Sequence, residues 1–269
     1  MNAPATDACV DVTTRDGVVE VALSTEPCNE IGEPMLDALE GVFHSLDLDE
    51  TRAVILYSTV RRGFSAGADL RALYEGLLNV DESEQGERIE AFIHRIHALF
   101  DLIDQLPVTT IAAVHGVCFG GGFELALTAD IIVAERTARF AFPELRLGLI
   151  PGFGGIPRLE RDVGGAVVRD LLLTGRSYNA AKAVSVGLAS QQVGRGEGLE
   201  VARAIARQAT RFEPTVQAQG KAFCKTLPTE RLDAEKTQFL EMIQRPIVRE
   251  ALRRFVEDDG PMPWLPGDA

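Results

Sequence analysis

Three features are scarce or missing in this 269-residue sequence, and each absence excludes a class of protein. No apolar run approaches the ~20 residues that a membrane-spanning helix needs. The N-terminus lacks the basic segment and following apolar run of a signal peptide. Basic residues are outnumbered, 27 Lys and Arg against 40 Asp and Glu, and the net charge of −13 repels a phosphate backbone. We therefore predict a cytoplasmic protein that binds neither membranes nor nucleic acid.

Clustered metal ligands are also missing. The four cysteines are scattered without a CxxC pair, at Cys9, Cys28, Cys118 and Cys224. This spacing argues against a cysteine-based metal site, and a disulfide framework is not expected in a chain of this length. His94 and His97 have the i,i+3 spacing of one helix face, but no third ligand accompanies them. We predict no metal, and a packing or hydrogen-bonding role for His115.

The hydrophobic pattern alternates between short strands and helices through most of the chain. Asp16 and Gly17 separate two β-rich runs and predict a hairpin turn. Strands are predicted at residues 10–13, 18–23, 53–57, 110–114 and 131–134. Helices are predicted from about residue 34, from residue 89, and over 123–127. This strand–helix–strand order indicates an α/β architecture.

Two segments depart from that alternation. Residues 79–88 are acidic and polar, which predicts a mobile loop. From residue 199 onward only helical patterns remain, over 229–243 and 247–256 among others. We therefore predict an α/β core over residues 1–198 and a helical C-terminal region over residues 199–269.

Two glycine-rich turns stand between strand and helix patterns. Residues 64–70 follow the strand at 53–57, and residues 116–124 contain three consecutive glycines, 120–122, before an apolar helix. The N–H groups at a helix start are unpaired and lie at its positive end, so they can hold an oxyanion. Neither turn ends in the Gly-Lys-Ser/Thr of a phosphate loop. A third glycine cluster, at residues 152–157, has Pro157 where the dinucleotide-binding fingerprint requires its last glycine. Each turn alone is more often just a tight connection.

Taken together, the glycine turns and other blocks resemble the enoyl-CoA hydratase/isomerase (crotonase) family. The similar blocks, in the right order, are residues 64–70, 120–125, 138–144, 148–152, 173–176 and 187–188. The resemblance implies an α/β fold of crotonase (ClpP/crotonase) type, with a core of repeated β-β-α units. It also implies that the helical region completes a homotrimer, often paired into a dimer of trimers.

The resemblance assigns the chemistry to a few positions. It implies that the backbone N–H groups of Ala68 and Gly121 form an oxyanion hole for an enolate, where one preorganised donor is worth roughly 3–4 kcal/mol. Glu124 and Glu144 match the family's acid/base pair, with Glu124 activating water for attack on Cβ and Glu144 protonating Cα. An isolated glutamate is normally a solvated surface residue. Desolvation beside Phe123 or Phe142 would raise the pKa of such a carboxyl toward neutrality.

Further residues are predicted to bind the substrate through the same resemblance: Ala66, Asp69, Leu70, Arg71 and Gly152. Arg71 is equally well explained as a solvated helix cation, and Gly152 nearly as well by a simple loop role. No cofactor is expected, because the coenzyme A or phosphopantetheine thioester is itself the substrate.

Two departures from the hydratase pattern concern the carrier of the acyl group. After the residue equivalent to Asn29, hydratases usually continue with a small residue and then an apolar one. This sequence instead continues with Glu30, Ile31 and Gly32. Asp258 and Asp259 stand where hydratases commonly place basic residues near the coenzyme phosphates. An acyl carrier protein is therefore an alternative to free coenzyme A.

The sequence thus predicts a lyase that hydrates an enoyl thioester or dehydrates its 3-hydroxyacyl counterpart. Double-bond isomerisation or C–C bond chemistry through the same enolate is the first alternative. A non-catalytic partner subunit or an RNA-binding relative is the second; the glutamate pair argues against the former and the net charge against the latter.

Overall fold

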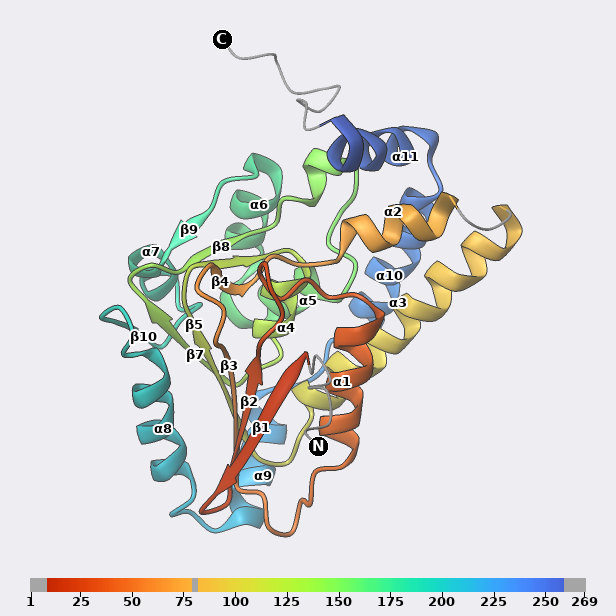
Figure 1. Ribbon diagram of the computed structural model, residues 1–269. Helices are drawn as coiled ribbons and strands as arrows, with labels where there is room; N and C mark the ends of the chain where they lie inside the picture. The colour runs from red at the N-terminus through yellow and green to blue at the C-terminus, as the bar shows by residue number, and fades with distance from the viewer. Residues whose placement is uncertain (1–8, 79–81, 259–269) are drawn as a thin grey trace, which may run out of the picture.

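The computed structural model describes residues 9–78 and 82–258, which form two β-sheets surrounded by helices (Figure 1). The larger sheet has the strand order β1-β2-β3-β5-β7-β10. Its strands are β1 (Val10–Arg15), β2 (Val18–Leu23), β3 (Ala53–Ser58), β5 (Thr109–Val114), β7 (Ile131–Glu135) and β10 (Gln191–Val193). The smaller sheet has the order β4-β6-β8-β9, from β4 (Gly63–Ser65), β6 (Val117–Phe119), β8 (Arg139–Ala141) and β9 (Tyr178–Asn179).

The predicted hairpin is confirmed. β1 pairs antiparallel with β2, Arg15 lies opposite Val18, and the two residues between them have positive φ, 51° at Asp16 and 75° at Gly17. The other pairings of the larger sheet are parallel. Parallel strands need both faces covered, which explains their nearly continuous apolar runs.

The core repeats one unit. A strand of the larger sheet is followed by a short strand of the smaller sheet and then by a helix, as in β3-β4-α2, β5-β6-α4 and β7-β8-η1. The helices of these units are α2 (Leu70–Leu78), α4 (Gly121–Ala126) and the 3-10 turn η1 (Glu144–Leu147). The predicted core of repeated β-β-α units is therefore confirmed. Its helix starts carry the residues of the predicted site.

Helices cover both faces of the larger sheet (Figure 1). On one face, α8 (Gly198–Ala209) packs Ala202 and Ala206 against strand residues such as Ile111. On the other lie α1 (Glu33–His44) and α3 (Glu82–Asp104). The remaining helices are α5 (Gly155–Val163), α6 (Gly165–Thr174), α7 (Ala180–Ser185), α9 (Pro214–Cys224), α10 (Thr229–Ile243), α11 (Pro246–Arg253) and the π-turn η2 (Arg254–Asp258).

The loop predicted at residues 79–88 is wrong where the structure describes it. Residues 79–81 lie outside the described residues, but α3 begins at Glu82 and includes the rest of the segment. Glu84, Glu87 and Arg88 are exposed on this helix. Glu and Arg are good helix formers, and an exposed first turn needs no apolar periodicity to be helical.

The described elements after β10 are all helices, and α8 begins at Gly198. A domain boundary at residue 198 stays a prediction, because α8 is packed on the sheet and α10 reaches the site described below. No helix in the described ranges combines the length and apolar character needed to cross a membrane.

Candidate active site

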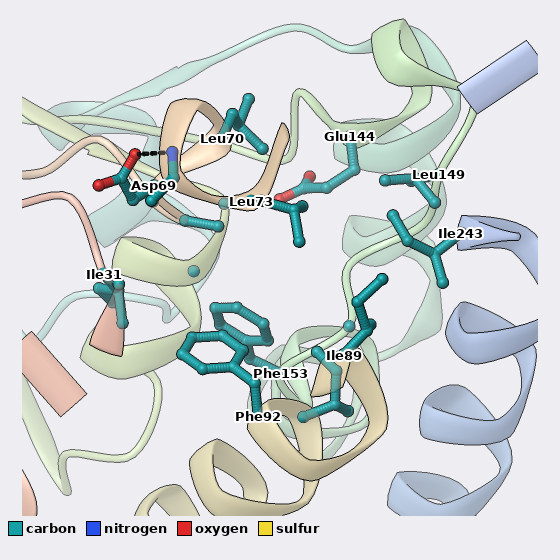
Figure 2. A pocket seen from close by; sticks show the side chains of 18 of the residues that line it. Ile31, Asp69, Leu70, Leu73, Ile89, Phe92, Glu144, Leu149, Phe153 and Ile243 are labelled. Atoms are coloured by element: carbon teal, nitrogen blue, oxygen red, sulfur yellow. Dashed lines mark hydrogen bonds between the residues drawn. The ribbon is translucent and has the colours of Figure 1, made fainter. Parts of the chain in front are cut away.

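A mostly apolar cavity of about 280 Å³ lies between the core and the helices α2, α3 and α10. Figure 2 shows Glu144 at one side of it and the rings of Phe92 and Phe153 at the other. Apolar side chains from these elements make most of the wall: Ile31, Leu70, Leu73, Ile89, Phe92, Ile93, Leu147, Leu149, Phe153, Phe239 and Ile243. Such a wall suits an apolar ligand with few polar anchors.

The two glycine-rich turns meet at this cavity, as Ala68 and Gly121 both line it. A Cβ built on Gly121 would lie 3.4 Å from the nitrogen of Ala68, and one on Gly67 would lie 3.2 Å from the nitrogen of Gly121. The two turns are therefore in contact, with their N–H groups a few ångströms apart. This proximity is what a pair of donors to one oxygen atom requires.

The backbone around Ala68 leaves its N–H available. Ile31 donates its N–H to the carbonyl of Gly67 at 2.8 Å and accepts from the N–H of Asp69 at 3.1 Å. Among the described residues, no backbone acceptor is paired with the N–H of Ala68. Gly121 is the first residue of α4, where N–H groups have no acceptor within the helix.

Glu124 lies on α4 with its side chain 2% exposed. Its Oε1 accepts the N–H groups of Phe153 at 2.8 Å and Gly155 at 2.9 Å. Burial raises the pKa of Glu124 to about 7, against the opposing effect of these two hydrogen bonds and of the Arg158 charge. Glu124 is thus held by main-chain donors and titrates near neutral pH.

Glu144 is the first residue of η1 and lines the same cavity. Its Oε2 is buried without a hydrogen-bond partner in the described structure. Burial raises the pKa of Glu144 well above its usual range, and the charge on Glu124 raises it further. The absence of a Cβ on Gly120 makes room for this carboxyl, since one would lie 2.5 Å from Oε1 of Glu144.

The other predicted site residues have distinct surroundings. Ala66, Asp69, Leu70 and Gly152 line the cavity. Oδ1 of Asp69 accepts the N–H of Ala72 at 2.9 Å and so caps α2, as Figure 2 shows. Arg71 is exposed and does not contribute to the cavity wall. No role in substrate binding is tested for these residues, and their assignments stay predictions.

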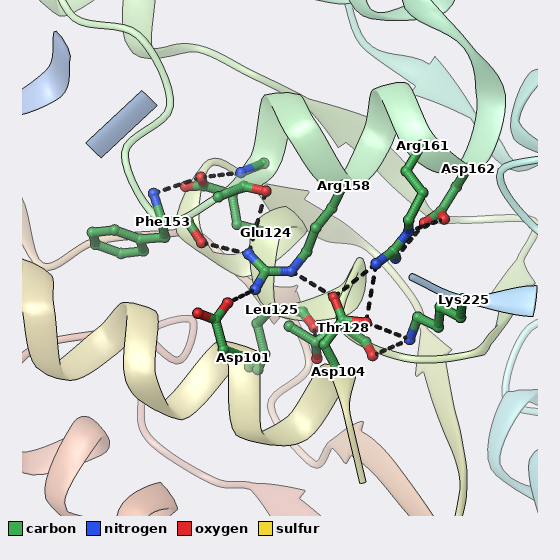
Figure 3. Close-up of polar contacts among 12 residues, drawn as sticks. Asp101, Asp104, Glu124, Leu125, Thr128, Phe153, Arg158, Arg161, Asp162 and Lys225 are labelled. Atoms are coloured by element: carbon green, nitrogen blue, oxygen red, sulfur yellow. Dashed lines mark hydrogen bonds and ion pairs between the residues drawn. The ribbon is translucent and has the colours of Figure 1, made fainter. Parts of the chain in front are cut away.

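Three further residues at the site are not predicted from the sequence, because each has a partner at least 54 residues away along the chain. Glu235 on α10 accepts the N–H groups of Gly154 and Ile156 at 2.7 and 2.8 Å. Buried Arg158 donates to the carbonyl of Phe153 at 3.1 Å and pairs with Asp104 at 2.7 Å, as Figure 3 shows. His97, for which no metal role is predicted, has its Nε2 2.8 Å from the carbonyl of Gly152.

The hydrogen bonds of His97 and His115 explain the roles of these two histidines. Burial lowers the pKa of His97 to about 4, so the ring is neutral and its Nε2–H donates to Gly152. His115 contacts the carbonyl of Val60 at 2.9 Å, the hydrogen-bonding role predicted for it. In residues 9–78 and 82–258, no three His, Cys, Asp or Glu side chains are grouped as a metal site requires.

The described geometry brings together two glycine-rich turns, with the N–H groups of Ala68 and Gly121 close to each other, and two carboxyls with raised pKa in one apolar cavity. The sequence pattern of the enoyl-CoA hydratase/isomerase family matches residues 13–264. The chain belongs to this family, and the resemblance identified from its sequence is confirmed.

Two individual proteins with similar sequences support this family assignment. The chain is 31% identical over 252 residues to a probable enoyl-CoA hydratase 2, mitochondrial, of Arabidopsis thaliana, covering 91% of this chain and 81% of that protein. It is 37% identical over 215 residues to a carnitinyl-CoA dehydratase of Salmonella arizonae, covering 79% of each. These relatives confirm the prediction of an enzyme of the hydro-lyase class.

Solved structures agree on the fold. The enoyl-CoA hydratase from Bacillus anthracis superposes with a TM-score of 0.74 at 28% identity, covering 94% of this chain and 98% of that one. An enoyl-CoA hydratase from Bacillus halodurans reaches a TM-score of 0.82 over 91% of this chain and 99% of that one. At 21% identity, this second similarity shows the fold alone.

Proposed function

We propose that this protein adds water to an α,β-unsaturated acyl thioester, or removes it from the 3-hydroxyacyl thioester. The observation that carries the proposal is the pair of carboxyls in one cavity, with Glu124 held by two N–H groups and the buried Oε2 of Glu144 held by none. Family membership and relatives that are themselves hydratases and dehydratases support the same reaction.

In the hydration direction, the Glu124 carboxylate takes a proton from water while the water oxygen bonds to Cβ. The electron pair of the double bond moves toward the thioester, and its oxygen becomes an enolate oxygen near the N–H groups of Ala68 and Gly121. The protonated carboxyl of Glu144 then gives its proton to Cα. Hydration thus transfers one proton to Glu124 and one away from Glu144; exchange with solvent restores both groups.

The electrostatics suit these roles. A general base needs a pKa near the working pH, and burial raises the pKa of Glu124 to about 7. A general acid must hold its proton until the transition state, and burial together with the Glu124 charge raises the pKa of Glu144 well above its usual range.

The reaction is tested by incubating the protein with a panel of enoyl and 3-hydroxyacyl thioesters in H₂¹⁸O and measuring product masses. Hydration incorporates one ¹⁸O at Cβ, whereas double-bond isomerisation, the alternative that uses the same enolate, incorporates none. A Glu124→Gln/Glu144→Gln double variant is the control. Absence of hydration, dehydration and isomerisation across the panel would show that the proposal is wrong.

We also propose that the coenzyme phosphates contribute little to binding, so that pantetheine thioesters or an acyl carrier protein also serve. Asp259 lies outside the described residues, as does the side chain of Asp258, so their expected effect on a phosphate stays a prediction. Arg253 and Arg254, two candidate cations, both pair with Glu250 within their own helical segment.

The carrier proposal is tested by comparing kcat/KM for one acyl group on coenzyme A, dephospho-coenzyme A and pantetheine. We expect less than a tenfold difference between the first two. A loss above roughly 100-fold on removing the 3′-phosphate, about 2.7 kcal/mol, would demonstrate a phosphate clamp and overturn this second proposal.

A further inference from the structure

Two carboxylates share the entrance to helix α5. The N–H groups of residues 153–156 are bound in alternation, with Phe153 and Gly155 donating to Glu124, and Gly154 and Ile156 donating to Glu235. All four distances are between 2.7 and 2.9 Å. The first N–H groups of a helix have no acceptor within it, so these carboxylates satisfy donors that would otherwise be unpaired.

The two carboxylates bind this turn differently. Glu124 uses Oε1 for both hydrogen bonds, whereas Glu235 uses Oε1 for Gly154 and Oε2 for Ile156. Glu235 is 6% exposed and lies on α10, 81 residues beyond Gly154. Because each of its oxygens accepts one N–H, Glu235 is anchored as a fork. The fork fixes the same turn that binds Glu124.

Glu235 interacts electrostatically with groups on three other elements: Glu124 on α4, Glu144 on η1 and Arg158 on α5. Burial raises the pKa of Glu235 well above its usual range; the charge on Glu124 raises it further, while the two N–H groups and Arg158 oppose this. On α3, His97 is neutral and Asp101 is paired with Arg158. Glu235 is therefore coupled to Glu124 by the shared turn and by the charge on Glu124.

We propose that Glu235 is a positioning residue for Glu124: its two carboxyl oxygens fix the turn whose N–H groups orient the Glu124 carboxyl. This inference rests on the proposed hydratase function, in which Glu124 is the base. It also gives helix α10 a part in the acid/base chemistry.

The test compares two substitutions at this position. Glu235→Gln keeps the shape but offers only one acceptor to the two N–H groups. We expect kcat to fall about tenfold with KM within twofold, and the acidic limb of the kcat/KM profile to move up by roughly half a pH unit, because the N–H groups that favour the Glu124 carboxylate are held less firmly against it. Glu235→Asp keeps both acceptors with a shorter reach, so kcat should fall and the acidic limb should move in the same direction.

Glu230→Gln, the same change at an exposed position of α10, is the matched control and should leave both kcat and the pH profile unchanged. A folded Glu235→Gln protein with the kcat and the acidic limb of the wild type would overturn the inference. A purely structural role would lower kcat and leave the acidic limb of both variants where it is in the wild type, and this outcome would also overturn it.

A second measurement does not depend on activity. Thermal unfolding of Glu124→Gln, Glu235→Gln and the double variant forms a double-mutant cycle, which isolates the interaction of the two side chains. We expect non-additive changes in stability, and additive changes would contradict a shared turn. If the wild type transforms no thioester, the proposed function is wrong, and the cycle alone decides whether the two carboxylates are coupled.

Discussion

At the scale of single residues, Glu144 carries the one buried side-chain oxygen without a partner in the described structure. An unsatisfied buried polar atom costs about 1–3 kcal/mol. The unpaired Oε2 therefore lowers the stability of the folded protein, and it belongs to a carboxyl that faces the proposed substrate cavity. This cost is understandable if the oxygen acquires its partner only when the substrate is bound.

Glu144→Gln tests this interpretation. The amide keeps the volume of the carboxyl but cannot deliver a proton, so we expect kcat to fall by about 10²-fold or more with little change in substrate affinity. Initial rates and a binding titration with a substrate analogue measure the two effects. Glu200→Gln on α8, whose side chain is 67% exposed, should match the wild type. Equal kcat in the wild type and Glu144→Gln would remove Glu144 from the mechanism.

The buried groups also predict how stability changes with pH. Since burial raises the pKa of Glu124 from 4.5 to about 7, the folded protein keeps a proton that the unfolded chain releases in this window, and stability falls as pH rises through it. At about 1.4 kcal/mol per unit, the loss is ~3 kcal/mol. His97 acts oppositely between pH 4 and 6.5, where its lowered pKa makes stability rise with pH.

We therefore expect the melting temperature to fall as pH rises above 6.5, where His97 no longer compensates and Glu144 and Glu235 add to the effect of Glu124. Glu124→Gln keeps an acceptor for the two N–H groups without an ionisable proton, so its stability should fall less steeply. Thermal unfolding from pH 5 to 9 measures both slopes. Parallel curves for the two proteins would contradict the assigned titration of Glu124.

At the scale of elements, the turn at Gly152 is held between two helices. His97 on α3 donates to its carbonyl, and the ring of Phe239 on α10 lies where a side chain at residue 152 would be. A Cβ there would be only 2.3 Å from the ring. This close packing explains why glycine is required at this position, and it connects α10 to the turn that binds Glu124.

Gly152→Ala should therefore destabilise the protein by about 1–3 kcal/mol, the usual cost of overpacking, and should lower kcat as the turn moves. Urea unfolding and initial rates measure these effects. Gly220→Ala in α9 is the control, because nothing lies within 4 Å of its Cβ. Replacing a helical glycine there should stabilise by about 0.5–1 kcal/mol. Equal stability of the two variants would contradict the packing described for Gly152.

At the scale of the whole molecule, apolar side chains are exposed on and beside α9. Phe223 is 90% exposed, Val216 67% and Phe212 54%, and α9 has no buried residue. These side chains are consistent with the predicted threefold oligomer, which no observation on the single chain tests. Truncation after Gly198 would test folding rather than assembly, because it also removes Glu235 and Phe239 from the site.

A substitution on α9 tests the oligomer more directly. We expect the wild type to sediment as a trimer or hexamer, and Phe223→Asp to shift it toward smaller species, because a charge would be buried at the contact. Phe223→Tyr keeps most of the apolar area and should assemble like the wild type. A wild-type monomer at micromolar concentration would contradict the oligomer, and an unchanged assembly of Phe223→Asp would exclude this face.

The sequence alone determined whatever depends on neighbours along the chain. The hairpin at Asp16, the apolar parallel strands and the glycine turns before α2 and α4 follow from local backbone requirements and hydrophobic period. Glu124 could be proposed as a site residue because it lies within a recognisable block, as does Glu144. Polar composition misled at residues 82–88, where an exposed helix start resembles a loop.

Only the tertiary structure decided how these groups act. Gly154 and Glu235 are 81 residues apart, and His97 and Gly152 are 55 apart, so no local pattern could pair them. The raised pKa of Glu124 depends first on desolvation by elements that meet only in the folded chain. Burial and long-range hydrogen bonding are properties of the packed molecule, which is why the sequence could name the two glutamates but not the helix that orients one of them.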